Sequence, residues 1–209
     1  MHKFIPIWIM ITALASAESP SELIGNLQKH YEQVQSFSAD FEQNFQGKGI
    51  FIRESGIVKM KKPGKMYWQY QQPNKKLFIA DGKKSYFYVP DDNQVIVTNL
   101  DLSDASIPLL FLIGKGDLNK DFHADFEKEE ETVGVNNTLL RLTPKGPQTV
   151  VSHVTLEINR STYLIHRLIV TESIGSRNEY ILRNMLQNGS FPDRLFVFKI
   201  PDKAEVIYQ

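Results

Sequence analysis

The chain contains no cysteine. A disulfide framework is therefore excluded, and so is the attachment of a lipid to a cysteine that follows an export signal. The fold must be held together by its core alone. Basic and acidic side chains balance at 24 each, which gives no reason to expect binding to nucleic acid or general adhesion to membranes.

Residues that carry out metal and covalent chemistry are also sparse. The five histidines fall in no metal-ligand spacing. Residues 117–121 begin like a calcium loop, but Phe122 stands where such a loop needs glycine and Lys128 where it needs glutamate. The sequence has no G-x-S-x-G motif, no phosphate-binding glycine loop and no carboxylate pair in a setting that would raise a pKa. It therefore predicts no metal, no cofactor and no catalytic residue.

Residues 1–17 have the pattern of a secretory signal peptide. Lys3 precedes an apolar run from Phe4 to Leu14, and an A-x-A site ends at Ala17. The alternative is a membrane anchor, but the run is shorter than the roughly 20 apolar residues that a spanning helix needs. We expect cleavage between Ala17 and Glu18, giving a soluble exported protein of residues 18–209 that is within the size range of one domain.

The exported part opens with an amphipathic helix over about residues 19–35. Ser19, Pro20 and Glu22 form the start signal of a helix, with a cap, a first-turn proline and a capping-box glutamate. Apolar residues then recur at helical spacing: Leu23, Ile24, Leu27, Tyr31 and Val34.

From Phe37 the apolar period changes to two, which predicts a strand with Phe37, Ala39, Phe41 and Phe45 on one face. Strands are also expected over Ile57–Met60, Met66–Gln71, Leu77–Ala80, Ser85–Val89, Gln94–Leu100, Val150–Ile158, Tyr163–Glu172, Asn178–Leu186 and Leu195–Ile200. Within Val150–Ile158, one face should carry Val150, Val154, Leu156 and Ile158, and the opposite face Val151, His153, Thr155 and Glu157. With about nine to eleven strands and two or three helices, the chain is predicted to be mainly β with helices (α+β). Its best architecture is one strongly curved antiparallel sheet with helices packed on the concave side.

The segment Ile107–Ile113 interrupts this pattern because it is apolar on every side. Pro108 near its start and Gly114 just after its end favour a short helix over a strand. Such a helix has to be buried, or has to cover an apolar surface.

Charge is unevenly placed along the chain. Eight lysines crowd one stretch: Lys59, Lys61, Lys62, Lys65, Lys75, Lys76, Lys83 and Lys84. Acidic residues crowd another: Asp117, Asp121, Asp125, Glu127, Glu129, Glu130 and Glu131. The two groups are either solvated faces or docking surfaces for different partners.

An ordered series of short motifs lies between Lys61 and Val95. It comprises Lys61-Lys62-Pro63, Trp68, Gln72-Pro73, Asp81-Gly82, Phe87-Tyr88 and Gln94-Val95. In this order and at these spacings the series resembles the outer-membrane lipoprotein carrier proteins, the LolA-like periplasmic chaperones. The N-terminal helix, the Phe-rich strand and the Ile107–Ile113 segment extend the resemblance over most of the exported chain.

The resemblance implies that residues 18–209 form a single lipoprotein-carrier domain, an incomplete, open β-barrel with a helical lid. Such a domain would be a monomeric, non-enzymatic carrier in the periplasm. An ATP-driven complex in the inner membrane would load it with acylated lipoproteins, and a receptor at the outer membrane would empty it. Releasing acyl chains into water costs about 0.8 kcal/mol per methylene, so a soluble carrier must enclose them.

The resemblance also implies roles for particular residues. Phe41, Met66 and Trp68 fall where the family lines its cavity, although ordinary core packing is the alternative for each. A lid helix would contain Leu109, Leu110, Phe111, Leu112 and Ile113. Lys62 matches an arginine that ties barrel to lid in many members. Lysine keeps the charge but lacks the planar fork, so Lys62 is either a different latch or a solvated side chain.

Two other functions remain open. A protein of the same fold that carries another lipid or a glycolipid across the periplasm would share these features. A secreted hydrolase that acts on an amphiphile is the alternative from another class, and it would have to assemble its catalytic residues from distant parts of the chain.

Overall fold

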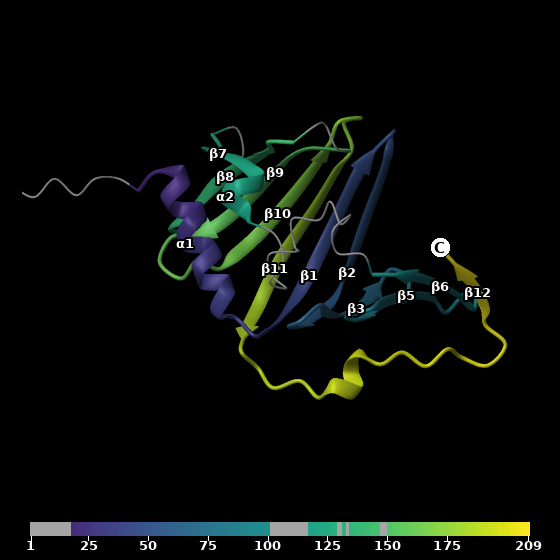
Figure 1. The fold of residues 1–209 in the computed structure, drawn as a ribbon. Coiled ribbons are helices and arrows are strands. Elements are labelled where there is room, and N and C mark those ends of the chain that lie inside the picture. The colour runs from purple at the N-terminus through teal and green to yellow at the C-terminus, as the bar shows by residue number, and fades with distance from the viewer. Residues whose placement is uncertain (1–17, 101–116, 129–130, 133, 147–149) are drawn as a thin grey trace, which may run out of the picture.

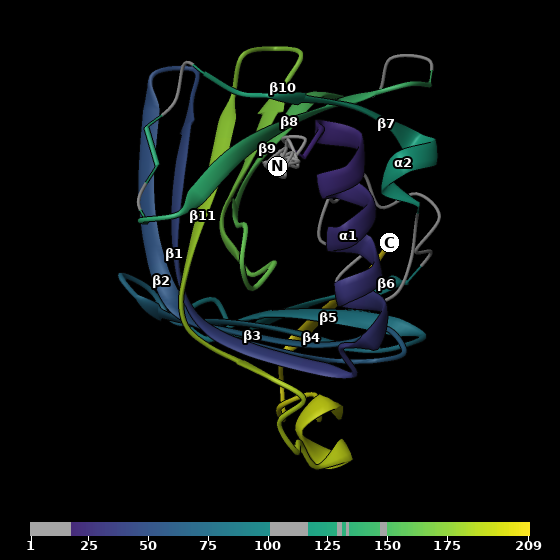
Figure 2. The same cartoon turned by 90° about the vertical axis from the view of Figure 1, so that its left-hand side faces the viewer.

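A computed structural model describes residues 18–100, 117–128, 131–132, 134–146 and 150–209. These residues form a 12-stranded sheet in the order β12-β6-β5-β4-β3-β2-β1-β11-β10-β9-β8-β7. The sheet curls into an open, incomplete barrel (Figures 1 and 2). The predicted curved sheet is confirmed. One pairing is not antiparallel, because β12 runs parallel to β6 at the edge.

The strands follow the chain as two meanders that meet where β1 pairs with β11. The first comprises β1 (Ser36–Gly47), β2 (Ile50–Lys61), β3 (Lys65–Gln72), β4 (Lys76–Asp81), β5 (Lys84–Val89) and β6 (Gln94–Asn99). The second comprises β7 (Phe122–Phe126), β8 (Asn137–Pro144), β9 (Val151–Asn159), β10 (Ile165–Glu172) and β11 (Arg177–Gln187), and β12 (Glu205–Tyr208) ends the chain. We refer to β2–β6 as the first arm and to β7–β10 as the second arm.

The predicted N-terminal helix is α1 (Pro20–Gln33). Ser19 caps it as expected: the Ser19 side chain accepts from the Glu22 amide, and the Glu22 carboxylate accepts from the Ser19 amide at 2.8 Å. The buried side of the helix carries Leu23, Ile24, Leu27 and Tyr31. The helix ends two residues before the predicted boundary, because Val34 already has extended backbone angles.

Helix α1 lies on the concave side of the sheet and packs on the second arm (Figure 2). It contacts β7 and the short helix α2 (Leu118–Asp121), where the Leu118 amide donates to Gln28 at 2.8 Å. The buried Tyr31 hydroxyl accepts from the Ile165 amide at 3.2 Å, at the start of β10. Helix α1 therefore packs on the concave side of the sheet, as predicted.

Strand β1 has the predicted alternation over its first half. Phe37, Ala39 and Phe41 are buried on the concave side, whereas Asp40 is exposed. The strand turns into β2 at Lys48 and Gly49, which both have positive φ angles, and positive φ at both central residues suits a tight hairpin. Strand β2 is longer than predicted, since it begins at Ile50.

The predicted strand over Leu195–Ile200 is wrong. Residues 193–196 form the short 3-10 helix η2 (Asp193–Phe196), and residues 197–200 have no regular structure. Phe196 is buried, and η2 packs on β3 and β4. Phe198 contacts the rings of Tyr86 and Tyr88 on β5. The apolar residues here cover the outer face of the first arm, so their alternation does not mark a strand.

Strand β9 also differs from the prediction. Val150 is exposed and precedes the strand, and both Thr155 and Glu157 are buried although they lie on the face opposite Val154 and Leu156. The Gly134 amide donates to Glu157 at 3.1 Å, and Arg167 on β10 contacts Glu157 at 2.9 Å. A segment of chain before β8 therefore covers the outer face of the second arm, which buries both faces of β9.

Strands β7 and β8 were not assigned from the sequence. The predicted lid residues, Leu109, Leu110, Phe111, Leu112 and Ile113, lie outside the residues that the structure describes. Within the described part of the chain, no helix has the length and apolar character needed to cross a membrane.

Candidate functional site

Four aromatic rings gather on the concave face near the middle of the sheet. Phe41 of β1 lies 5.0 Å from Trp68 and 5.0 Å from Tyr70 of β3, and Trp68 lies 5.7 Å from Tyr180 of β11, all between ring centroids. We call these four residues the aromatic cluster. Such tilted and edge-on contacts are favourable for aromatic pairs. The cluster joins β1, β3 and β11, and it is the largest aromatic assembly that the described ring contacts define on this face.

Strand register explains why these rings meet. Phe41 pairs with Gly56 of β2, and Gly56 pairs with Tyr70, so all three positions project to one face. Gly56 lies at a register shift between β2 and β3, where an added Cβ would be 1.9 Å from the Gln69 carbonyl oxygen. Only glycine therefore allows β3 to approach here, and because Gly56 has no side chain the rings of Phe41 and Tyr70 contact each other across it.

The structure brings together the cavity residues that the resemblance implied. Phe41, Met66 and Trp68 lie on the concave face in one apolar cluster, each less than a tenth exposed. Beyond Trp68 the same face continues through Phe78 of β4 and Phe87 of β5, which pair with each other and are only half-buried. The first arm thus presents apolar surface on its concave side that the chain does not fully cover.

Lys62 connects the first arm to α1. It follows β2, and its Nζ donates to the carbonyl oxygens of Tyr31 at 2.6 Å and Glu32 at 3.3 Å. These carbonyls belong to the last turn of α1, where the Tyr31 carbonyl also accepts from the Val34 amide at 3.2 Å and where the negative end of the helix dipole lies. Partial burial lowers the pKa of Lys62, and the nearby Glu32 carboxylate opposes this shift. Lys62 is therefore bound to the helix end rather than freely solvated.

Other lysines of the basic stretch are also engaged within the chain. Lys61 and Lys65 contact the Asp193 carboxylate at 2.7 and 3.1 Å, and Lys76 contacts Glu54 at 2.5 Å. The two lysines lower the pKa of Asp193. At least these three lysines thus have partners inside the molecule, and the first two hold the segment that leads to β12.

Sequence reasoning missed the polar side chains beside the aromatic cluster. They are Gln43, Glu54, Tyr70, Lys76, Asn178 and Tyr180, and we call them the polar network. Following the period of two from Phe41 places Gln43 on the concave face, and the strand register then adds Glu54 and Tyr180. The pairing of β1 with β11 could not be read from the sequence, so the signal was incomplete.

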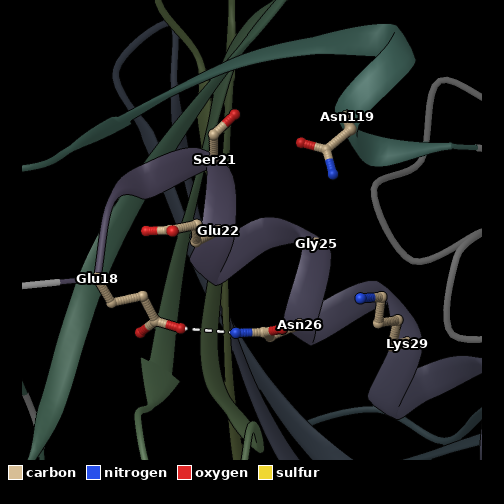
Figure 3. Close-up of a pocket in the computed structure, with 7 residues that line it drawn as sticks. All are labelled: Glu18, Ser21, Glu22, Gly25, Asn26, Lys29 and Asn119. Carbon is tan, nitrogen blue, oxygen red and sulfur yellow. Dashed lines mark hydrogen bonds between the residues drawn. The ribbon is translucent and has the colours of Figure 1, made fainter. Parts of the chain in front are cut away.

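A separate pocket of about 570 Å³ lies at the N-terminal half of α1 (Figure 3). Its walls are mostly polar, and the Asn26 amide donates to Glu18 at 2.9 Å across it. The lining residues are Glu18, Ser21, Glu22, Gly25, Asn26, Lys29 and Asn119. Such walls do not suit an acyl chain, so this pocket is not the counterpart of the aromatic cluster.

The residues that the structure describes contain no candidate metal site. Across them, no three histidine or carboxylate side chains come close enough to hold a metal ion.

The described residues thus form an open, curved sheet whose concave face carries the aromatic cluster and the half-buried rings of Phe78 and Phe87. Residues 32–199 match the family model described as outer membrane lipoprotein carrier protein LolA. The chain therefore belongs to the outer-membrane lipoprotein carrier family, whose members are non-enzymatic periplasmic carriers. The resemblance found in the sequence is confirmed.

Named relatives agree with this placement. The outer-membrane lipoprotein carrier protein of Chromohalobacter salexigens is 32% identical over 178 residues, covering 84% of this chain and 82% of that protein. The protein of the same name from Nitrosomonas europaea is 25% identical over 209 residues and 99% of both chains. A solved structure of a conserved Thermus thermophilus protein has a TM-score of 0.57 at 11% identity, covering 90% of this chain and 98% of that one, which shows a shared fold.

Proposed function

We propose that this chain carries acylated lipoproteins across the periplasm by holding their acyl chains against the concave face of the sheet. Residues 1–17 direct export and are removed after Ala17, and residues 18–209 act as one carrier domain. An ATP-driven complex of the inner membrane supplies the lipoprotein, and a receptor at the outer membrane accepts it. The carrier itself has no catalytic task.

The observation that carries this proposal is the apolar surface of the first arm. Phe78 and Phe87 are only half-buried, and they lie on the same concave face as the buried rings of Phe41 and Trp68. Apolar area removed from water contributes about 25 cal/mol per Å², so an acyl chain laid over these rings is stabilised along its whole length. The second arm offers no comparable surface, because its concave side is already covered by α1.

Lys62 forms a weak contact between the first arm and helix α1. Helix α1 is packed on the second arm through Tyr31, while the Lys62 ammonium attaches the end of that helix to the first arm. A lysine holds the carbonyls as a point charge, without the planar fork of an arginine. The concave face can therefore open at this contact while α1 stays on the second arm. The segment Leu109–Ile113 would complete the cover as a lid over the bound acyl chains.

The proposal is tested by purifying the exported chain from the periplasm of its own host without detergent and weighing the intact complexes by native mass spectrometry. We expect one acylated lipoprotein per chain. A bound free lipid or glycolipid would instead establish the alternative carrier function. A chain that is always empty, and remains empty after incubation with purified acylated lipoprotein, would overturn the carrier function.

A matched pair of variants locates the binding surface in the same experiment. Phe87→Gln places an amide on the concave surface of β5, and Tyr88→Gln places one on the opposite face of the same strand. We expect the first to reduce copurified lipoprotein strongly and the second to leave it unchanged. Equal loss in both, with both proteins folded by circular dichroism, would contradict binding on the concave face.

A further inference from the structure

The polar network interrupts an otherwise apolar concave face. Its members come from five strands, but they share one side of the sheet: Tyr180 pairs with Gln43, and Gln43 pairs with Glu54. Gln43 lies two residues from Phe41 on β1, so both side chains project to the concave face. Tyr70 and Tyr180 belong to both groups, because their rings are part of the aromatic cluster while their hydroxyls reach the polar network.

The hydrogen bonds of the network run in one direction. Tyr70 Oη donates to Gln43 Oε1 at 3.1 Å, Gln43 Nε2 donates to Asn178 Oδ1 at 3.0 Å, and Asn178 Nδ2 donates to Tyr180 Oη at 3.0 Å. Tyr180 accepts the last of these bonds. The hydroxyl hydrogen of Tyr180 has no acceptor within the described part of the chain. The chain of donors thus ends in one hydroxyl that is still able to donate.

Charge within the network is balanced. Lys76 Nζ lies 2.5 Å from Glu54 Oε1 and 5.2 Å from the centre of the Tyr70 ring. Burial raises the pKa values of Tyr70 and Tyr180, and the Glu54 carboxylate acts in the same direction, so both phenols are neutral donors. A site with one neutral donor and a matched ion pair favours a neutral oxygen acceptor. A free carboxylate or phosphate would meet the negative charge of Glu54 without an unpaired cation to compensate it.

Building on the proposed function, we propose that the Tyr180 hydroxyl binds the carbonyl oxygen of an acyl ester or amide whose hydrocarbon chain lies along the half-buried rings of Phe78 and Phe87. A neutral carbonyl is the acceptor that an acylated molecule carries at the head of each chain. A hydroxyl beside apolar rings gains more from that acceptor than from an ether oxygen, because the carbonyl is the stronger acceptor. The polar network therefore sets the position of an acyl chain along the concave face, which the apolar contacts alone leave free to slide.

The test compares two short lipids that differ only in the carbonyl, a dioctanoyl glycerol and the corresponding dioctyl glycerol ether. Each is used to displace a fluorescent hydrophobic probe from the purified chain. One hydrogen bond contributes about 0.5–1.5 kcal/mol, so we expect the ester to bind about two- to tenfold more tightly than the ether. The variant Tyr180→Phe should bind the ester as weakly as the ether and bind the ether as the unmodified chain does.

Tyr86→Phe is the matched control, since Tyr86 lies on the outer face of β5 against Phe198, 5.4 Å between ring centroids. This variant should keep the preference for the ester. Equal binding of ester and ether to the unmodified chain, or a preference that survives in Tyr180→Phe, would overturn the assignment of Tyr180. Failure of both lipids to displace the probe would count against the carrier function itself, because the ether needs only the apolar surface.

A second comparison tests the balance of charge. The unmodified chain should bind the ester more tightly than the decanoate anion, and Glu54→Gln should gain affinity for decanoate several-fold because Lys76 is then unpaired. A preference of the unmodified chain for decanoate would contradict a site for neutral carbonyls.

Discussion

The two arms of the sheet bury their concave faces in different ways. On the second arm, Leu140, Leu156 and Leu168 are completely buried, because the side chains of α1 pack on them. On the first arm, Phe78 and Phe87 stay half-buried, and the aromatic cluster ends in the hydroxyls of the polar network. The concave face of the second arm is therefore packed tightly beneath a helix, whereas the concave face of the first arm keeps two aromatic rings partly exposed.

The outer faces differ as well. The second arm buries the Arg167–Glu157 ion pair under the segment before β8, with side chains 8% and 0% exposed. The first arm is covered on its outer face by apolar residues of the C-terminal segment, such as Phe196. The outer face is thus packed around a buried ion pair on the second arm and beneath apolar side chains on the first.

Breaking the buried ion pair should have the largest effect on stability. Arg167→Met removes the guanidinium that contacts the fully buried Glu157 carboxylate, so we expect the free energy of unfolding to fall by about 3–5 kcal/mol. Arg53→Met is the control, because Arg53 is 65% exposed beside Glu42 and such surface pairs contribute about 0–1 kcal/mol. Urea titrations followed by circular dichroism measure both. Similar losses in the two variants would refute the special role of the second arm.

Truncating one apolar side chain in each arm sharpens the comparison. Leu156→Ala removes a fully buried side chain and should cost about 2–5 kcal/mol, depending on how far the cavity collapses. Phe78→Ala should cost less than half as much, since part of its ring is already in water. The same urea titrations decide the point. If Phe78→Ala were the more damaging change, the first arm would be core rather than binding surface.

Lys62 should affect the mobility of α1 more than global stability. Lys62→Met removes the bonds to the Tyr31 and Glu32 carbonyls, each worth about 1.5–3 kcal/mol at most because the donor is charged. We expect faster hydrogen exchange in the last turn of α1, and slower exchange in Lys62→Arg. Mass spectrometry of peptides from residues 20–33 measures this. Lys59→Met serves as the control. Unchanged hydrogen exchange in Lys62→Met would contradict a role of Lys62 in holding the end of α1.

The smallest predicted effect concerns the C-terminal segment. Lys61 and Lys65 lower the pKa of Asp193 from its ordinary value of 3.8, so their contact stabilises the fold fully above that value. The stabilisation is lost only as the pH falls through the lowered pKa. Exchange in residues 193–209 should therefore rise in this acidic range, and Asp193→Asn should show the faster exchange already at neutral pH. The absence of a difference between Asp193→Asn and the unmodified chain at neutral pH would contradict this.

Local patterns predicted much of this fold. The capping box fixed the start of α1 at Ser19, and the period of two from Phe37 identified the concave face of β1. The pairing of β1 with β11 was not predictable, because it joins residues more than a hundred positions apart. Leu195–Ile200 was misread for a related reason: apolar residues that cover the outside of a sheet look like a strand in sequence.

Only part of the candidate site could be predicted from the sequence. The resemblance to the carrier family singled out Phe41, Met66 and Trp68, which the structure brings together, and their role in binding stays a prediction. The Lys61-Lys62-Pro63 motif drew attention to Lys62, and the structure places it at the end of α1. The polar network was missed because Gln43, Glu54 and Asn178 look like solvent-facing residues along their own strands. Only the pairing of β1 with β2 and with β11 brings these residues together on the concave face.

The most direct test of the account places a photo-crosslinking residue at two neighbouring positions of β3. Trp68 faces the concave side, and Gln69 faces the opposite side. A benzophenone amino acid is introduced at each position, the chain is loaded with a lipoprotein that carries radiolabelled acyl chains, and the sample is irradiated. The account predicts that label is transferred to the chain from position 68 and not from position 69. Equal transfer from both positions, or transfer from position 69 alone, would contradict binding of acyl chains to the concave face.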